Sequence, residues 1–245
     1  MLMNKIYVVG IGPGKIEEMT RHAVAALEES EVIAGYDVYV DLVRTYFPGK
    51  TFLSTPMRRE TERCCLALEH AAAGETVSMV CSGDAGVYGM AGLIYETAQR
   101  FPPVEIEVVP GITAACSGAA LLGAPLIHDF AVISLSDLLT PWELIERRLD
   151  AASAADFSIC LYNPSSRKRQ DHLQRACEIL LRHRSPDNIA GIVRNIGREG
   201  ETAQVTTLSQ LLTIQTDMFT TVFVGNSQTK NINGKMVTPR GYRGE

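Results

Sequence analysis

The sequence predicts an α/β fold with a largely parallel sheet. Strand-like and helix-like segments alternate along almost the whole chain, and glycine-containing turns follow several of the strands. The chain has 245 residues, of which 46% are hydrophobic and 21% charged, a balance typical of globular proteins. No low-complexity linker divides it. We expect two α/β domains, residues 1–120 and 121–245, with a cleft between them.

The first half shows strand and helix patterns in turn. Thr20 is placed to cap a helix, and Gly74 to end another. A helix rich in small residues is expected after Gly111. The predicted strands cover 5–9, 32–34, 76–81 and 104–109, and the predicted helices cover 20–30, 59–73 and 112–122.

The second half repeats the alternation. Thr140, Pro141 and Glu143 have the order of an N-cap, a first helical position and a capping box. Asn233-Gly234 stands between two alternating arms and predicts a β-hairpin over 229–239. The predicted strands cover 130–135, 157–162, 189–193 and 220–224, and the predicted helices cover 140–152, 170–183 and 208–212.

Composition excludes several classes of function. The formal charge of −5 and the pI near 5.6 argue against a dedicated nucleic-acid binder. No apolar run reaches the roughly 18 residues of a membrane span. The N-terminus has no signal-peptide pattern, so a cytoplasmic location is expected. The six cysteines include no Cys-x-x-Cys pair, which favours a reduced compartment and no metal site.

Glycine-rich segments follow the predicted strands. Parallel sheets bind ligands beyond the carboxyl ends of their strands, so these segments predict a site built from both halves of the chain. The segments are 10–14, 82–89, 110–113, 162–166, 194–197 and 225–227.

The first segment, Gly10-Ile11-Gly12-Pro13-Gly14, departs from a dinucleotide fingerprint. The third glycine of that fingerprint would fall at Lys15, and Pro13 removes an N–H that could hold a phosphate. A nicotinamide oxidoreductase therefore loses most of its support. A tight turn that binds no ligand stays open.

The second and third segments carry polar groups among small residues. Asp84 could accept hydrogen bonds from ribose hydroxyls or an amine, or it could cap a helix beginning near Val87. Thr113 and the alanines after it leave room for a flat ring, or they serve close helix packing.

Together these motifs resemble the tetrapyrrole methylase family. Gly10–Gly14, Gly83-Asp84 with Val87-Tyr88-Gly89, and 110–114 occur in order and at similar spacings over nearly the whole chain, with Ala85 departing from a common proline. The resemblance implies S-adenosylmethionine as methyl donor, S-adenosylhomocysteine as product, and a homodimer. The cofactor-binding residues that it implies are Pro13, Ser82, Gly83, Asp84, Val87, Tyr88, Thr113, Ala114, Tyr162, Asn163, Asn195 and Ile196.

The run from His128 to Trp142 resembles one branch of that family. Members of the branch methylate carbon 17 of precorrin-3B, or of its cobalt-loaded equivalent, and contract the ring to precorrin-4 in cobalamin biosynthesis. The segments 162–166 and 194–198 resemble the same branch. Other acceptors, including protein or RNA, and a non-catalytic tetrapyrrole carrier remain alternatives.

Proton transfers during ring contraction favour a general acid or base. His128 and Asp137 are the candidate catalytic residues; a local hydrogen-bonded pair and a turn residue are the structural alternatives. A polycarboxylate substrate also needs cations, which arginine supplies in bidentate form. The candidates are Arg58, Arg59, Arg167, Lys168, Arg194 and Arg198.

Overall fold

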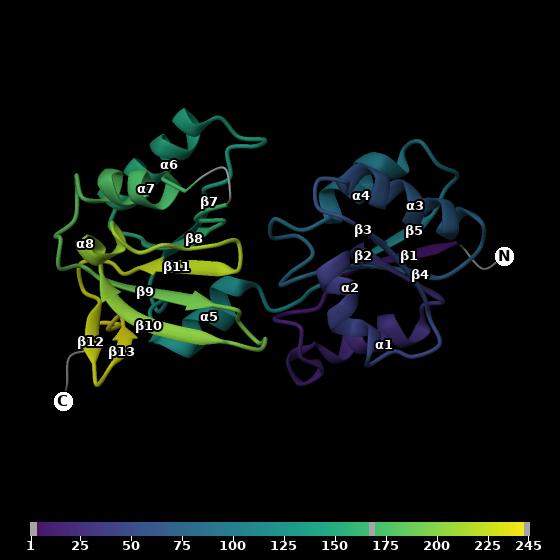
Figure 1. The fold of residues 1–245 in the computed structure, drawn as a ribbon, viewed down its shortest axis with the longest axis horizontal. Coiled ribbons are helices and arrows are strands. Elements are labelled where there is room, and N and C mark those ends of the chain that lie inside the picture. The colour runs from purple at the N-terminus through teal and green to yellow at the C-terminus, as the bar shows by residue number, and fades with distance from the viewer. Residues whose placement is uncertain (1–3, 167–169, 243–245) are drawn as a thin grey trace. The chain divides into compact units, whose positions relative to one another are not determined.

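The computed structural model describes residues 4–166 and 170–242. By its internal contacts the chain divides into two compact units, Met1–Ala114 and Ala115–Glu245. Figure 1 shows that each unit has its own central sheet with helices packed on it. Helix α5 (Ala114–Leu122) belongs almost wholly to the second unit, whereas the sequence analysis places the boundary after residue 120. Its buried residues, including Ala115 and Leu122, pack against Phe223 of the second sheet, which explains the difference.

The sheet of the first unit is fully parallel, as predicted. Its strand order is β3-β2-β4-β1-β5. All five strands therefore end at one edge of the sheet. The strands are β1 (Lys5–Gly10), β2 (Val32–Tyr36), β3 (Thr51–Thr55), β4 (Val77–Cys81) and β5 (Glu105–Val109).

Helices cover both faces of this sheet (Figure 1). Along β1, Ile6 and Val8 join one buried cluster, while Tyr7 and Val9 join the other, as the alternation of a strand requires. The first cluster includes residues of α3 (Glu60–Ala72) and α4 (Ala91–Ala98), and the second includes residues of α1 (Arg21–Glu29) and α2 (Asp37–Arg44). The short 3-10 helix η1 (Ile16–Glu18) precedes α1. The predicted cap of α1 is confirmed, because Thr20 Oγ1 accepts a hydrogen bond from the N–H of Ala23 at 3.0 Å.

The sheet of the second unit is mixed, so the predicted parallel arrangement is wrong for this half. Its order is β10-β9-β11-β8-β7; only β7 and β8 pair in parallel. The chain turns back after β9, so β10 runs antiparallel beside it, and β11 inserts between β9 and β8, antiparallel to both. The strands are β7 (Phe130–Ser134), β8 (Ser158–Tyr162), β9 (Ile189–Arg194), β10 (Thr202–Thr207) and β11 (Thr220–Val224).

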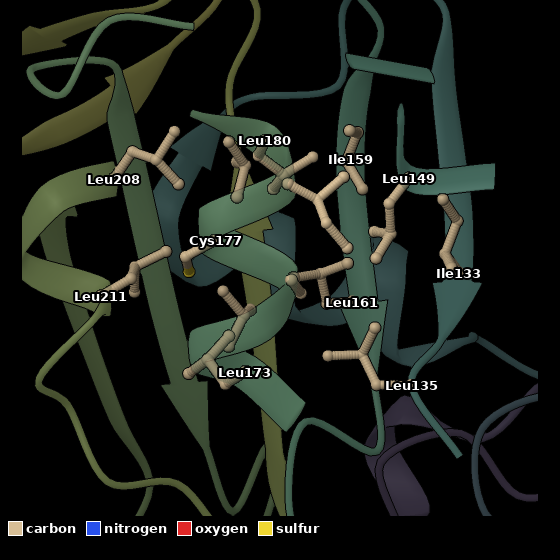
Figure 2. Close-up of a cluster of buried hydrophobic side chains, with 14 of the residues drawn as sticks. Ile133, Leu135, Leu149, Ile159, Leu161, Leu173, Cys177, Leu180, Leu208 and Leu211 are labelled. Carbon is tan, nitrogen blue, oxygen red and sulfur yellow. The ribbon is translucent and has the colours of Figure 1, made fainter. Parts of the chain in front are cut away.

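Helices α6 (Trp142–Ala154) and α7 (His172–Leu180) pack on one face of the second sheet, and α5 packs on the other. Figure 2 shows Leu173, Cys177 and Leu180 of α7 lying against Ile159 and Leu161 of β8. The remaining elements are α8 (Leu208–Leu211), β6 (Gly123–Ala124), β12 (Lys230–Ile232) and β13 (Lys235–Val237).

Two local predictions in the second unit have clear outcomes. The hairpin at Asn233-Gly234 is confirmed, with both residues at positive φ between β12 and β13. The capping box at Thr140 is wrong: Pro141 is the N-cap of α6 and makes no side-chain capping bond. The structure instead has a capping box in α8, where Thr207 and Gln210 bond reciprocally.

The sequence analysis predicts none of α2, η1, β3, β6 and β10, and it suggests α4 only as a helix that Asp84 could cap near Val87. Strands β3 and β10 lie at sheet edges, and polar residues outnumber apolar ones in both, so neither shows an apolar run in the sequence. Within the described residues, no helix has the length and apolar character needed to cross a membrane.

Candidate functional site

Three glycine-rich loops of the first unit join through their backbones. They follow β4, β1 and β5, which are neighbours in the sheet. The N–H of Gly12 donates to the carbonyl of Gly83 at 3.0 Å, and the N–H of Gly83 donates back to Gly12 at 2.8 Å. The N–H of Ile11 also donates to Cys81 at 2.9 Å. The loops after β1 and β4 therefore form one connected backbone surface.

Glycine is required where the third loop joins. A Cβ at Gly111 would lie 2.2 Å from the carbonyl oxygen of Gly83 and 2.5 Å from that of Gly10. A Cβ at Gly10 would lie 2.7 Å from the nitrogen of Gly111. Real side chains do not occupy such distances, so the three loops can pack this closely only without side chains at these positions.

Asp84 connects two of the loops. Its Oδ1 accepts hydrogen bonds from the N–H groups of Gly86 at 2.8 Å and Val87 at 3.1 Å. Its Oδ2 accepts one from Gly111 at 3.0 Å. The suggested cap of a helix near Val87 is wrong, because α4 begins only at Ala91. An ionised carboxylate has about four acceptor sites, so three bonds still leave capacity for a ligand.

The end of the second loop presents apolar and strained residues. Val87 and Tyr88 are exposed, and Tyr88 has a φ of 54°, which is uncommon for a residue with a side chain. A Cβ at Gly89 would lie 2.3 Å from the carbonyl oxygen of Ala85, so this tight turn also needs glycine. Eight predicted cofactor residues follow β1, β4 and β5: Pro13, Ser82, Gly83, Asp84, Val87, Tyr88, Thr113 and Ala114.

The other four predicted cofactor residues follow strands of the second unit. Tyr162 ends β8, and its phenol accepts a hydrogen bond from the N–H of Ala115 at 2.6 Å. Asn163 has a φ of 52°, and its side-chain amide donates to Ser134 Oγ at 3.0 Å. Asn195 follows β9 with a φ of 53°. Because β7, β8 and β9 run in one direction, the structure brings these loops to the same edge of the second sheet.

Ile196, the last of these four, has a packing role in the second unit. Its Cδ1 atom lies 3.1 Å from the position that a Cβ on Gly118 of α5 would occupy. The loop after β9 is therefore fitted closely to α5.

One predicted loop lies at the wrong edge. Gly225–Ser227 follows β11, which is antiparallel to β8 and β9, so it lies opposite the ends of those strands. Accordingly, the N–H of Gly225 donates to Ile189, the first residue of β9, at 2.9 Å. Ser227 bonds Asp156, which precedes β8. The expectation that this segment joins the site is wrong because β11 reverses direction.

The structure does not bring the two candidate catalytic residues together. His128 precedes β7, and its Nε2 lies 3.0 Å from the carbonyl oxygen of Pro239. Asp137 follows β7, at the edge where β8 and β9 end. A five-residue strand places its two ends about 15 Å apart, given a rise of about 3.3 Å per residue.

Asp137 instead meets His172, which the sequence analysis missed. Its Oδ2 lies 3.1 Å from Nε2 of His172, an ion-pair distance without the alignment of a hydrogen bond. The His172 ring is buried at the start of α7, edge-on to Trp142 with ring centroids 4.8 Å apart. The only signal in the sequence was a histidine beginning an amphipathic helix, and nothing local connected it to a residue 35 positions earlier.

The candidate cations differ in the partners that their side chains have. Arg59 pairs with Glu62 at 2.6 Å, and Arg194 pairs with Asp217 at 2.8 Å. Burial raises the pKa of Asp217, but hydrogen bonds from Thr220, Arg194 and Phe219 outweigh it and hold that pKa below its ordinary value. Arg167 and Lys168 lie outside the described residues. Arg198 lies near Phe219, 5.8 Å above its ring, and Arg58 is described below.

The first unit, with its parallel sheet and interlocked glycine loops at the carboxyl edge, is typical of α/β enzymes that bind a small ligand at that edge. The family model described as tetrapyrrole (corrin/porphyrin) methylases matches residues 5–212. The chain belongs to the tetrapyrrole methylase family.

Relatives align with nearly the whole chain. It is 48% identical to the "Probable cobalt-factor III C(17)-methyltransferase" of Salmonella typhimurium, over 96% of this chain and 98% of the relative. It is 46% identical to the "Cobalt-factor III methyltransferase" of Priestia megaterium, over 99% of this chain; it spans about half of that relative's length, 46%. The "Precorrin-3B C(17)-methyltransferase" of Sinorhizobium sp is 40% identical over 98% of this chain.

Solved structures agree on the fold. The crystal structure of the methyltransferase CobJ has a TM-score of 0.88 and 37% identity, covering 96% of this chain and 99% of CobJ. A uroporphyrin-III C-methyl transferase from Thermus thermophilus, complexed with S-adenyl homocysteine, has a TM-score of 0.71 at 23% identity, covering 90% of this chain and 97% of that one. This second likeness concerns the fold alone.

Proposed function

We propose that this chain is an S-adenosylmethionine-dependent C-methyltransferase of cobalamin biosynthesis. Its acceptor is carbon 17 of precorrin-3B or cobalt-factor III, and the product is the ring-contracted precorrin-4 or cobalt-precorrin-4. The observation that carries the proposal is the identity of 48% to the Salmonella relative along 96% of this chain. The Sinorhizobium relative, which is named for the metal-free substrate, supports the same carbon.

The loops after β1, β4 and β5 suit the methyl donor. Glycines at 10, 83 and 111 expose backbone groups instead of side chains, and the exposed side chain of Val87 offers apolar surface for an adenine ring. Asp84 and Thr113 supply polar groups at the same edge. S-adenosylmethionine brings a methyl group on a sulfonium, which needs no covalent enzyme intermediate. The loops then act by binding and orienting, because alignment of donor and acceptor at about 3 Å supplies much of the acceleration.

Four residues of the second unit complete the proposed cofactor set: Tyr162, Asn163, Asn195 and Ile196. The left-handed backbone at both asparagines fixes the directions of the loops that leave β8 and β9. Asparagine adopts this conformation more readily than most residues with a side chain, so the sequence suits these turns.

Asp137 is the proposed general acid or base for the proton transfers of ring contraction. It lies at the carboxyl edge of the second sheet, and one of its oxygens lies 3.1 Å from Nε2 of His172. His128, the other candidate, binds a backbone carbonyl at the opposite end of β7. We further propose that the protein acts as a homodimer.

The test uses S-adenosylmethionine labelled in its methyl group. Purified protein is incubated separately with precorrin-3B and with cobalt-factor III, and the label in the pigment is measured. We expect transfer to at least one of them, together with tight binding of S-adenosylhomocysteine and none of NAD by calorimetry. If the label reaches neither pigment, the proposed acceptor is wrong. NAD binding without S-adenosylhomocysteine binding refutes the methyltransferase class.

A further inference from the structure

Arg58 is an exposed arginine held in an unfavourable backbone conformation. It lies in the turn between β3 and α3, with a φ of 70°, and its backbone N–H donates to Glu60 Oε1 at 3.1 Å. Residues with a Cβ avoid this left-handed region; most other residues of the described chain found there are glycine, asparagine or aspartate, and Tyr88 of the second glycine-rich loop is the exception. Strain of this kind is often found where a side chain has to be presented to a ligand.

A buried arginine fixes the chain just before this turn. Only 5% of Arg63 is exposed. Its Nε donates to Thr55 Oγ1 at 2.9 Å, and its Nη2 donates to the carbonyl oxygens of Thr55 and Pro56, both at 3.2 Å. In the described part of the chain, the hydrogen bonds of Arg63 go to Thr55, Pro56 and Met90, and none goes to a carboxylate. Because a buried cation must be satisfied by hydrogen bonds, these acceptors are held firmly in place.

The same guanidinium reaches the loop that follows β4. Its Nη1 lies 4.0 Å from Sδ of Met90, and the next residue, Ala91, donates to the carbonyl of Ala85 in that loop. Strand β2 alone separates β3 from β4, so two strand spacings, about 10 Å, separate the arginine turn from the second glycine-rich loop. Both lie at the carboxyl edge of the sheet.

Arg58 and its neighbour differ in what their side chains bind. Arg59 is already paired with Glu62 at 2.6 Å. The guanidinium of Arg58 makes no hydrogen bond or ion pair with any residue that the structure describes. Its donors are therefore available to a planar anion, which arginine binds in bidentate form.

We propose that Arg58 binds a carboxylate of the tetrapyrrole substrate and that Arg63 is the positioning residue for its turn. This inference rests on the proposed function, which supplies a substrate bearing carboxylates. The first unit would then bind an edge of the substrate as well as the methyl donor. The buried guanidinium of Arg63 would fix both the turn at Arg58 and the loop after β4.

The decisive variant is Arg58→Gly, because glycine accepts a φ of 70° and leaves the turn intact. We expect the KM and the directly measured Kd for cobalt-factor III to rise about tenfold or more, as for loss of a charge-assisted hydrogen bond. The Kd for S-adenosylhomocysteine should stay within about twofold, and the melting temperature should not fall. Asn233→Gly is the matched control; it replaces another left-handed residue, in the β12–β13 turn, and should leave both constants unchanged.

Arg63→Lys keeps the positive charge but loses the planar guanidinium that donates to both Thr55 and Pro56. We expect it to raise the KM for cobalt-factor III. If the two residues act together, the double variant with Arg58→Gly should have no higher KM than Arg58→Gly alone. Additive effects contradict the positioning role. If the wild type transfers methyl and Arg58→Gly leaves the KM and Kd unchanged, or lowers the melting temperature, the inference is wrong and the proposed function stands. If the wild type transfers none, the proposed function fails, while the Kd still tests the carboxylate contact.

Discussion

The phenol of Tyr162 accepts a 2.6 Å hydrogen bond from the backbone N–H of Ala115, 47 residues earlier in the chain. Ala115 lies in the first turn of α5, where N–H groups have no partner within the helix. Tyr162 is the last residue of β8. The bond therefore joins the start of a helix to the end of a strand and fixes one side of the candidate site in the second unit.

Replacing this tyrosine tests the bond. Tyr162→Phe keeps the ring and leaves the Ala115 N–H without its acceptor. We expect a loss of about 1 kcal/mol and a melting temperature lower by about 2–4 °C. Circular dichroism during heating measures it. Tyr95→Phe is the control, since the exposed Tyr95 hydroxyl makes no hydrogen bond within the described residues. Equal melting temperatures for both variants would show that the bond contributes nothing.

The carboxylate of Asp84 is predicted to hold the loops after β4 and β5 together. Asp84→Ala removes the acceptor of three backbone N–H groups, so we expect a loss of about 1–3 kcal/mol in the free energy of unfolding. The affinity for S-adenosylhomocysteine should fall as the loops separate. Urea unfolding and calorimetry measure the two effects. Asp41→Ala, at an exposed carboxylate 3.7 Å from Arg44, should change neither. Unchanged affinity in Asp84→Ala would remove Asp84 from the site.

The glycine at 111 is predicted to be irreplaceable. In Gly111→Ala the new methyl would lie 2.2 Å from the Gly83 carbonyl oxygen, so the loops must move apart. We expect S-adenosylhomocysteine binding to be lost or weakened at least tenfold. Gly92→Ala is the matched control, because a Cβ there meets nothing within 4 Å and the residue lies in α4. That variant should gain roughly 0.5–1 kcal/mol of stability and bind normally. Normal binding by Gly111→Ala would contradict the close packing.

Acid should weaken the second unit through Asp217. The folded protein holds the pKa of this carboxyl below its ordinary 3.8, since its hydrogen bonds to Thr220, Arg194 and Phe219 outweigh the effect of burial. A lowered pKa stabilises the fold above the unfolded value, and this stability is lost as the pH falls through the folded value. We expect the urea midpoint to drop below about pH 4, and less steeply in Asp217→Asn. Glu178→Gln, on the surface of α7, is the control. Identical pH profiles for the wild type and Asp217→Asn would contradict the shift.

The parallel half of the fold could be predicted from the sequence because its central strands are buried runs followed by glycine-rich loops. β1 and β4 have this form, and helices recur between them. The edge strands β3 and β10 could not be predicted, because polar residues outnumber apolar ones in both and resemble loop sequence. Nor does the sequence show in which direction each strand of the second half runs. The insertion of β11 between β8 and β9 is a long-range pairing that no local pattern specifies.

The candidate site shows the same limit. The three glycine loops were predictable together because parallel neighbours end at one edge. The contact of Asp137 with His172 was not, since it depends on how α7 docks on the sheet. The loop at Gly225 is predicted at the wrong edge, because the sequence does not show in which direction β11 runs.

The central place of β11 has a consequence for biosynthesis. β7, β8 and β9 leave the ribosome well before Thr220–Val224, yet β11 separates β8 from β9 in the finished sheet. The second sheet therefore cannot close until Thr220–Val224 has been translated, whereas the first unit has all five of its strands by Val109. A chain truncated before residue 220 should keep a folded first unit and leave β8 and β9 as unpaired edges, open to aggregation or proteolysis.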